Sequence, residues 1–138
     1  MNYFITEIYC ANTDWPSNNV CYLRPQNGQG KWRWILYDTD LGFGLDGTGY
    51  TQDMFSWLNE RSTGEGVLVP NTLIIFMELM KTEQFRNEFY TAVIQQMGSV
   101  YHPSIVTVLL DSIQAELGGD GISRGKMGHD VRRLEQRN

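Results

Sequence analysis

The amino-acid sequence predicts an α+β domain that is mostly helical, with one β-hairpin packed on the helices. Two runs with strand-like alternation, residues 20–24 and 31–38, flank a turn segment that contains Asn27-Gly28, which is typical of a hairpin. Most of the chain after residue 50 has apolar residues at helical spacing. Since a single two-stranded hairpin is not stable alone, it must lie against the helices.

The elements are predicted in a fixed order along the chain. Phe4, Ile5 and Ile8 recur at helical spacing, and Pro16 prevents the first helix from continuing. A loop of Asn, Asp and Ser then leads into the hairpin, and a glycine-rich loop follows the hairpin. Helices are expected over residues 2–11, 51–60, 73–80, 82–97 and 102–117, with a last helical start at 129–137.

Composition limits the classes of function. Hydrophobic residues make up 41% of the chain and charged residues 20%, which is typical of a globular protein with a buried core. The 11 basic and 16 acidic residues give a formal net charge of −5, which argues against a nucleic-acid-binding surface. No apolar run approaches the ~20 residues that a membrane-spanning helix needs. We therefore expect no nucleic-acid partner and no membrane span in this chain.

Cys10 and Cys21 are the only cysteines. Two cysteines do not supply the four ligands of a structural zinc site, and neither histidine is close to them in sequence. A disulfide between them is one interpretation, although small disulfide-stabilised scaffolds contain more cysteines. The simpler interpretation is that both thiols are buried and pack as small hydrophobic side chains.

The first candidate for chemistry is the pair Asp14 and Asn19, which have the spacing Asp-x-x-x-x-Asn in the loop after the first helix. Phosphoryl transfer needs a carboxylate that orients the attacking hydroxyl and accepts its proton. It also needs an amide oxygen a few residues later to hold Mg²⁺. By itself this spacing is more typical of a solvated turn or a helix cap.

The second candidate is Asp38-Thr39-Asp40, at the end of the second predicted strand. Mg²⁺ prefers oxygen ligands and is usually held by one or two carboxylates together with substrate phosphates. A strand end before a glycine-rich loop can fix Asp38 and leave room for phosphate. A pair of turn-forming aspartates is the structural alternative.

The order of these pieces is more informative than either one. A helix, an Asp-x4-Asn loop, a hairpin and a strand-end Asp followed by Gly is the layout of a protein-kinase catalytic core. Asp40-Leu41-Gly42 also imitates the metal-binding Asp-Phe-Gly triplet of kinases.

The sequence resembles the CotH (spore coat protein H) kinase family. The most specific part is the first 44 residues, including Asn-Thr-Asp-Trp-Pro-Ser-Asn-Asn at 12–19 and Trp-Ile-Leu-Tyr-Asp-Thr-Asp-Leu-Gly-Phe-Gly at 34–44. The resemblance continues through residues 76–80 and 85–89 and covers about residues 2–117. It implies an atypical bacterial protein kinase, here a C-lobe-like fragment, from a spore coat, cell surface or secreted protein.

The resemblance also implies roles for the candidate residues. Asp14 would be the catalytic base, and Asn19 and Asp38 would bind Mg²⁺ and ATP. Asp40 would be a secondary metal ligand. The strand favours Asp38 as the main ligand, whereas the triplet favours Asp40, so this choice is left open. The substrate would be Ser or Thr of a coat or surface protein.

A complete kinase core also needs a glycine-rich loop over the nucleotide and a Lys–Glu pair on an upstream lobe. Only Met1 precedes the first helix, and Glu7 within it is a poor candidate for that Glu. We therefore expect one partial domain over residues 1–138, with the candidate loops and hairpin in 1–50 and a helical subdomain in 51–138. We expect the natural protein to continue upstream, and the isolated chain to be inactive.

Two alternatives belong to other classes of function. The same fold could serve as a non-catalytic coat or surface module for protein interaction, in which case Asp14, Asn19 and Asp38 need not converge. A carbohydrate-binding module would instead show several tryptophans stacked outward in a groove. The tryptophans available for such a face are Trp15, Trp32, Trp34 and Trp57.

Overall fold

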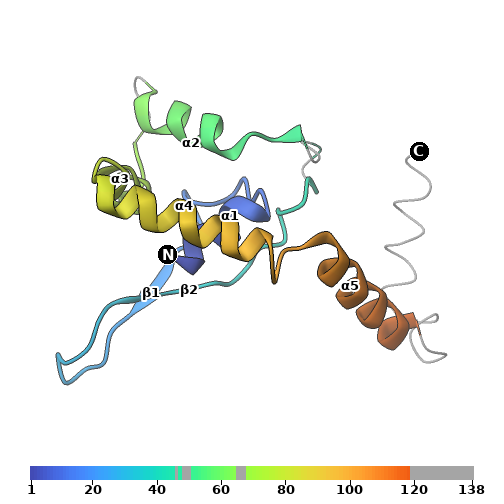
Figure 1. The fold of residues 1–138 in the computed structure, drawn as a ribbon. Helices are drawn as coiled ribbons and strands as arrows, with labels where there is room; N and C mark the ends of the chain where they lie inside the picture. The colour runs from blue at the N-terminus through green and yellow to red at the C-terminus, as the bar shows by residue number, and fades with distance from the viewer. Residues whose placement is uncertain (46, 48–50, 65–67, 119–138) are drawn as a thin grey trace. The chain divides into compact units, whose positions relative to one another are not determined.

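The computed structural model describes residues 1–45, 47, 51–64 and 68–118 (Figure 1). This part of the chain holds five helices and one two-stranded antiparallel sheet, so the prediction of a mostly helical α+β domain is confirmed. The predicted helical start at 129–137 lies outside the described residues. The elements are α1 Asn2–Tyr9, β1 Cys21–Leu23, β2 Arg33–Ile35, α2 Met54–Thr63, α3 Asn71–Met80, α4 Glu83–Met97 and α5 Pro103–Gly118.

The chain divides into two compact units, Met1–Val93 and Ile94–Asn138. The first unit contains α1, the hairpin, α2, α3 and most of α4, and it carries every candidate site residue. The described part of the second unit is residues 94–118, which hold the end of α4 and all of α5. No helix in the described part of the chain is long and apolar enough to cross a membrane.

Helix α1 ends two residues earlier than predicted, because the backbone reverses at Ala11. Ala11 has a φ of 51°, in the left-handed region. The main-chain N–H of Ala11 donates to the carbonyl of Ile8 at 3.1 Å, and that of Asn12 donates to the carbonyl of Glu7 at 3.2 Å. These two bonds are those of a Schellman motif, in which glycine usually occupies the reversing position. The reversal turns the chain directly into the loop that contains Asp14.

The hairpin strands have three residues each, which is shorter than the predicted runs. Cys21 pairs with Ile35, and Tyr22 pairs with Trp34. Trp34 packs on α1, with ring centroids 6.0 Å from Tyr3 and 6.0 Å from Phe4. Trp34 therefore anchors the hairpin to the helical part.

Phe4 is the centre of the core of the first unit. Its ring stacks on Phe76 of α3 at 4.9 Å and meets Trp15 edge-on at 6.1 Å. Phe76 in turn contacts Phe89 of α4 at 5.4 Å. Trp15 is fully buried although it belongs to a loop. Since burial of a large aromatic side chain dominates local packing energy, this loop is held in place by the core.

We expect Ala11→Gly to stabilise the first unit by about 0.5–1 kcal/mol. A left-handed alanine costs ~1–2 kcal/mol, and the greater backbone entropy of glycine in the unfolded chain offsets part of the gain. Urea unfolding followed by circular dichroism measures the difference. Ala92→Gly, inside α4, is the matched control and should destabilise by ~1 kcal/mol. Loss of stability in both variants would contradict the assigned turn.

Candidate functional site

Two loops meet at the C-terminal end of α1. The Asp14 loop, residues 11–19, continues from α1, and the Asp38 loop, residues 38–44, follows β2. The main-chain N–H of Phe43 donates to the carbonyl of Cys10. The ring of Phe43 also meets the ring of Tyr9 edge-on, with centroids 6.0 Å apart. The helix end is thus the platform on which the second loop rests.

The carboxylate of Asp14 organises its own loop. Its Oδ1 accepts a hydrogen bond from Nδ2 of Asn18 at 2.7 Å, and its Oδ2 accepts one from Nδ2 of Asn19 at 2.8 Å. Both side chains of the Asp-x-x-x-x-Asn motif therefore converge, as phosphoryl-transfer chemistry requires of them.

Asn19 also connects the two loops. The same Nδ2 group donates to the main-chain carbonyl of Asp38 at 3.1 Å. The structure therefore brings Asp14, Asn19 and Asp38 together, with Asp38 joined through its backbone and not through its carboxylate. Asp40 is exposed two residues further on and takes no part in these bonds.

The backbone of both loops adopts costly conformations. In the described part of the chain four non-glycine residues have φ between 51° and 55°, and all four lie in these loops. Such residues cost on the order of 1–3 kcal/mol each, persist only where surrounding contacts impose them, and cluster at functional sites. Asn and Asp tolerate the left-handed region better than other side chains. The residues are Ala11, Asn19, Asp38 and Phe43.

A buried pair, Glu7 and Asn12, supports the Asp14 loop from below. Both residues are 0% exposed. Nδ2 of Asn12 donates to Oε2 of Glu7 at 2.9 Å, and Oδ1 of Asn12 accepts the main-chain N–H of Asp14 at 3.2 Å. The sequence analysis missed this pair. The available signal was that Glu7 lies three residues after Phe4, on the buried face of α1.

Burial raises the pKa of the Glu7 carboxyl, and the hydrogen bond from Asn12, followed by the nearby hydroxyl of Tyr3, partly opposes this. Oε1 of Glu7, the hydroxyl of Tyr3 and Nε1 of Trp15 form a buried polar cluster. In the part of the chain that the structure describes, none of these three atoms completes a hydrogen bond of good geometry. The three groups are close enough to affect one another. Burial raises the pKa of Tyr3, and the nearby Glu7 raises it further.

The second loop can pack so closely because residue 42 is glycine. A Cβ on Gly42 would lie 3.0 Å from the carbonyl oxygens of Cys10 and Thr39. Any side chain at this position would push the Asp38 loop away from α1. Glycine is therefore required in the Asp-Leu-Gly triplet for steric reasons, and not because of the backbone angles at this position.

Carboxylate and amide oxygens at this site are ligands that suit Mg²⁺. Asn19 uses its nitrogen in both of its bonds to the loops, so its Oδ1 is the atom that a cation would take. Within the described ranges no group of three His, Cys, Asp or Glu residues is placed to hold a metal.

The tryptophans do not form an outward face. Trp15 is fully buried, Trp34 and Trp57 are half-buried, and only Trp32 is largely exposed. This arrangement does not support a carbohydrate-binding surface of four tryptophans. Both cysteines are free, and Cys10 is buried. Burial, followed by the nearby Glu7, raises the pKa of the Cys10 thiol to about 11, which agrees with a thiol that serves in packing.

Comparison with known families gives one result. The family model described as "CotH kinase protein" matches residues 1–125 of the 138-residue chain. No curated protein and no solved structure matches the chain. The matched range contains both loops and all the described elements.

We expect Glu7→Gln to remove the loss of folding stability that Glu7 causes as the pH rises. A carboxyl whose pKa is higher in the folded state binds its proton more tightly there. The free energy of unfolding then falls as pH rises from about 4.3, the ordinary pKa, through the raised folded value. Glutamine stays neutral, so its stability advantage over Glu7 should grow as the pH rises above about 4.3. Urea unfolding at a series of pH values measures this difference.

The control for this measurement is Glu83→Gln, at an exposed position on α4, which should leave the pH profile nearly unchanged. Glu7→Ala should instead lose ~1–3 kcal/mol at every pH, because it leaves the Asn12 amide buried and unpaired. Parallel profiles for wild type and Glu7→Gln would show that Glu7 titrates normally in the folded protein.

We expect Gly42→Ala to destabilise the first unit by about 1–3 kcal/mol, because the new methyl group overlaps two carbonyl oxygens. Hydrogen exchange at Phe43 should accelerate, since its amide bonds to Cys10 next to the overlap. Gly98→Ala is the control, because there the nearest atom would lie at an ordinary 3.4 Å. Equal stability of the two variants would contradict the close approach at Gly42.

Proposed function

The chain belongs to the CotH kinase family, and we propose that it forms the C-lobe-like, catalytic-loop part of an atypical protein kinase. In this proposal the complete protein transfers the terminal phosphoryl group of ATP to Ser or Thr of a protein substrate. A bacterial coat or cell-surface protein is the substrate class that membership of this family favours.

The observation that carries the proposal is the double hydrogen bond of Asn19. One amide group holds the Asp14 carboxylate and the carbonyl of Asp38, which lie 24 positions apart in the sequence. A solvated turn or a simple helix cap would not need this link. The link supports a single cleft in which a base and metal-binding oxygens act together.

Asp14 would act as the general base. Its two oxygens are oriented by Asn18 and Asn19, and the loop behind it is held by Asn12. The carboxylate would accept the proton of the substrate hydroxyl as the oxygen attacks the phosphorus and ADP departs. Positioning of this kind is the main protein contribution to phosphoryl transfer.

Asn19 and Asp38 would hold Mg²⁺ with the phosphates of ATP. When bound, the cation would neutralise the charge that develops on the transferred group. Asp38 follows β2 by three residues, and its left-handed backbone directs the loop back toward α1. Asp40 is proposed as the secondary ligand, because it lies outside the hydrogen-bonded network.

The isolated chain should bind Mg²⁺ and ATP weakly. Kinases also use a glycine-rich loop over the nucleotide and a Lys–Glu pair to hold ATP. Glu7 cannot serve in that pair, because it is fully buried against Asn12. Substantial ATP turnover by the isolated chain, abolished by Asp14→Ala, would overturn this expectation.

The test is ATP-dependent autophosphorylation in the protein as it is naturally expressed, with Mg²⁺ present. Asp14→Asn and Asp38→Asn should each lower the rate at least about 10²-fold, because each removes a charge at the reacting centre. Asp40→Asn should lower the rate less than Asp38→Asn does. Phosphate incorporation at saturating ATP is the readout.

Asp111→Asn, at an exposed position on α5, is the matched control and should retain the wild-type rate. Folding of each variant is checked by its unfolding midpoint. Wild-type rates in both Asp14→Asn and Asp38→Asn would leave the chain without the proposed chemistry.

A further inference from the structure

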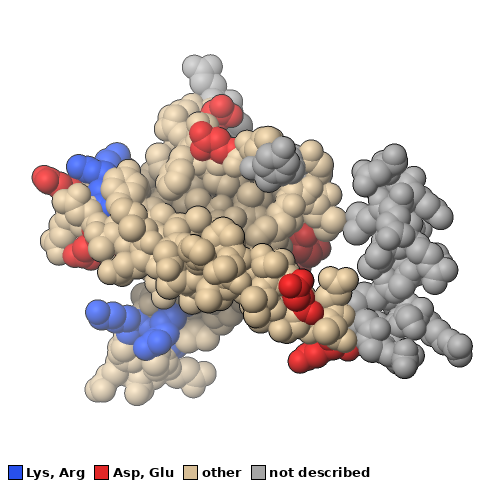
Figure 2. Space-filling view, turned by 45° about the vertical axis from the view of Figure 1, so that its right-hand side comes forward, with Lys and Arg blue, Asp and Glu red and all other residues tan. Residues whose placement is uncertain are grey.

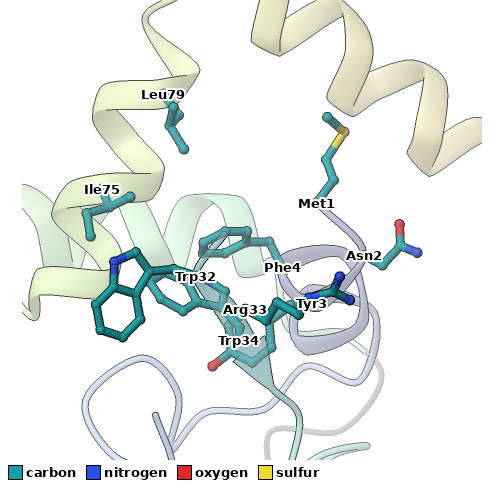
Figure 3. A pocket seen from close by; sticks show the side chains of 9 residues that line it. All are labelled: Met1, Asn2, Tyr3, Phe4, Trp32, Arg33, Trp34, Ile75 and Leu79. Atoms are coloured by element: carbon teal, nitrogen blue, oxygen red, sulfur yellow. The ribbon is translucent and has the colours of Figure 1, made fainter. Parts of the chain in front are cut away.

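An open groove of about 650 Å³ lies at the N-terminal end of α1, away from the candidate site (Figure 3). Its walls come from α1, β2 with the residue before it, and α3. The groove lies at the first turn of α1, and the Asp14 loop begins beyond its last residue, Tyr9. The side chains that matter here are Met1, Trp32, Arg33, Trp34, Ile75 and Leu79.

The groove exposes large apolar side chains. Trp32 is 58% exposed, and Met1, Ile75 and Leu79 are 41%, 43% and 38% exposed. In Figure 3 the indole of Trp32 lies below Ile75, while Leu79 and Met1 border the open space above Phe4. Removal of such side chains from water stabilises a complex. A contiguous exposed apolar patch with a polar rim is typical of a docking surface.

Positive charge borders the groove, because Arg33 lines it and Arg24 lies against the ring of Trp32. Arg24, Lys31 and Arg33 are the charged residues of segment 15–37, which contains no Asp or Glu, in a chain whose net charge is −5. Figure 2 shows Lys and Arg atoms without acidic neighbours on the lower projection of the molecule, where the hairpin lies. None of the three forms an ion pair in the described part of the chain. The guanidinium carbon of Arg24 lies 5.1 Å from the ring centroid of Trp32.

We propose that this groove binds an acidic peptide segment of a partner protein. The segment seats an aromatic or aliphatic side chain between Trp32 and the α3 residues Ile75 and Leu79, and its carboxylates lie against Arg33 and Arg24. Trp, Tyr and Arg are the side chains enriched in binding hot spots, and Tyr22 packs edge-on against Trp32 at 5.4 Å. The proposal goes beyond phosphoryl transfer and does not depend on it.

Charge selects this occupant over a second copy of the chain. In a symmetric dimer the same patch faces itself, so the cations of both hairpins would be brought together. Like charges in contact cost several kcal/mol across an interface. An acidic segment instead gains attraction to Arg33 and Arg24, in addition to burial of its apolar side chain.

The test is fluorescence polarisation with a labelled peptide in which Phe-Leu is flanked on both sides by Asp-Glu pairs. The 138-residue chain should bind this peptide at least about tenfold more tightly than a peptide with Lys in place of every acid. It should also prefer it over a peptide with Ser-Ser in place of Phe-Leu. Affinity should fall with added salt, because the rim contacts are exposed.

Two variants test the residues. Trp32→Ala should weaken binding about tenfold or more, and Arg33→Glu should weaken binding of the acidic peptide while strengthening binding of the basic one. The controls are Trp57→Ala and Arg61→Glu, a second Trp–Arg pair on α2 with a separation of 4.1 Å. They should leave the affinity within about twofold.

Asp14→Asn should not change peptide binding, so failure of the phosphoryl-transfer proposal and failure of this one are distinguishable. Equal affinity for acidic and basic peptides, or unchanged affinity in both Trp32→Ala and Arg33→Glu, would overturn the docking site. Sedimentation that shows a dimer lost in Trp32→Ala would assign the groove to a second copy instead.

Discussion

Asn12 donates its side-chain amide to Glu7 in the interior of the first unit, where neither residue reaches water. The other end of the same amide accepts the backbone N–H of Asp14. A buried polar group without a partner costs ~1–3 kcal/mol, so this pair has one favourable arrangement. This arrangement also fixes the candidate catalytic loop, because Asp14 cannot move without leaving the side-chain oxygen of Asn12 unpaired.

The two loops of the site contain strained backbone conformations, and contacts with the core hold these conformations in place. Asn19 and Asp38 are both in the left-handed region, and one hydrogen bond joins them. The contact of Phe43 with the end of α1 and the close approach of Gly42 fix the second loop from its other side. A candidate site built in this manner is fixed by contacts within the chain, which would lower the entropy that ligand binding must overcome.

Sequence patterns predicted which helices and strands occur more accurately than where each one begins and ends. Apolar spacing identified all five described helices, but it extended α1 to residue 11, since a Schellman turn with alanine has no distinct signature. The order of Asp14, Asn19 and Asp38 indicated residues that the structure brings together, whereas Glu7 and Asn12 were missed. Their importance comes from tertiary burial, and a carboxylate on an apolar helix face gives only a weak signal. The groove beside Trp32 was equally hidden, because it depends on α3 lying near β2.

Full burial of Trp15 next to Asp14 has a consequence for how the site fluctuates. Loops usually open locally at small cost, and functional loops are often among the least protected segments of a protein. Here the loop cannot lift away without exposing an indole that contacts Phe4, so its opening is coupled to disruption of the aromatic core. We therefore expect amide exchange around Asp14 to follow opening of the aromatic core and not that of a surface loop.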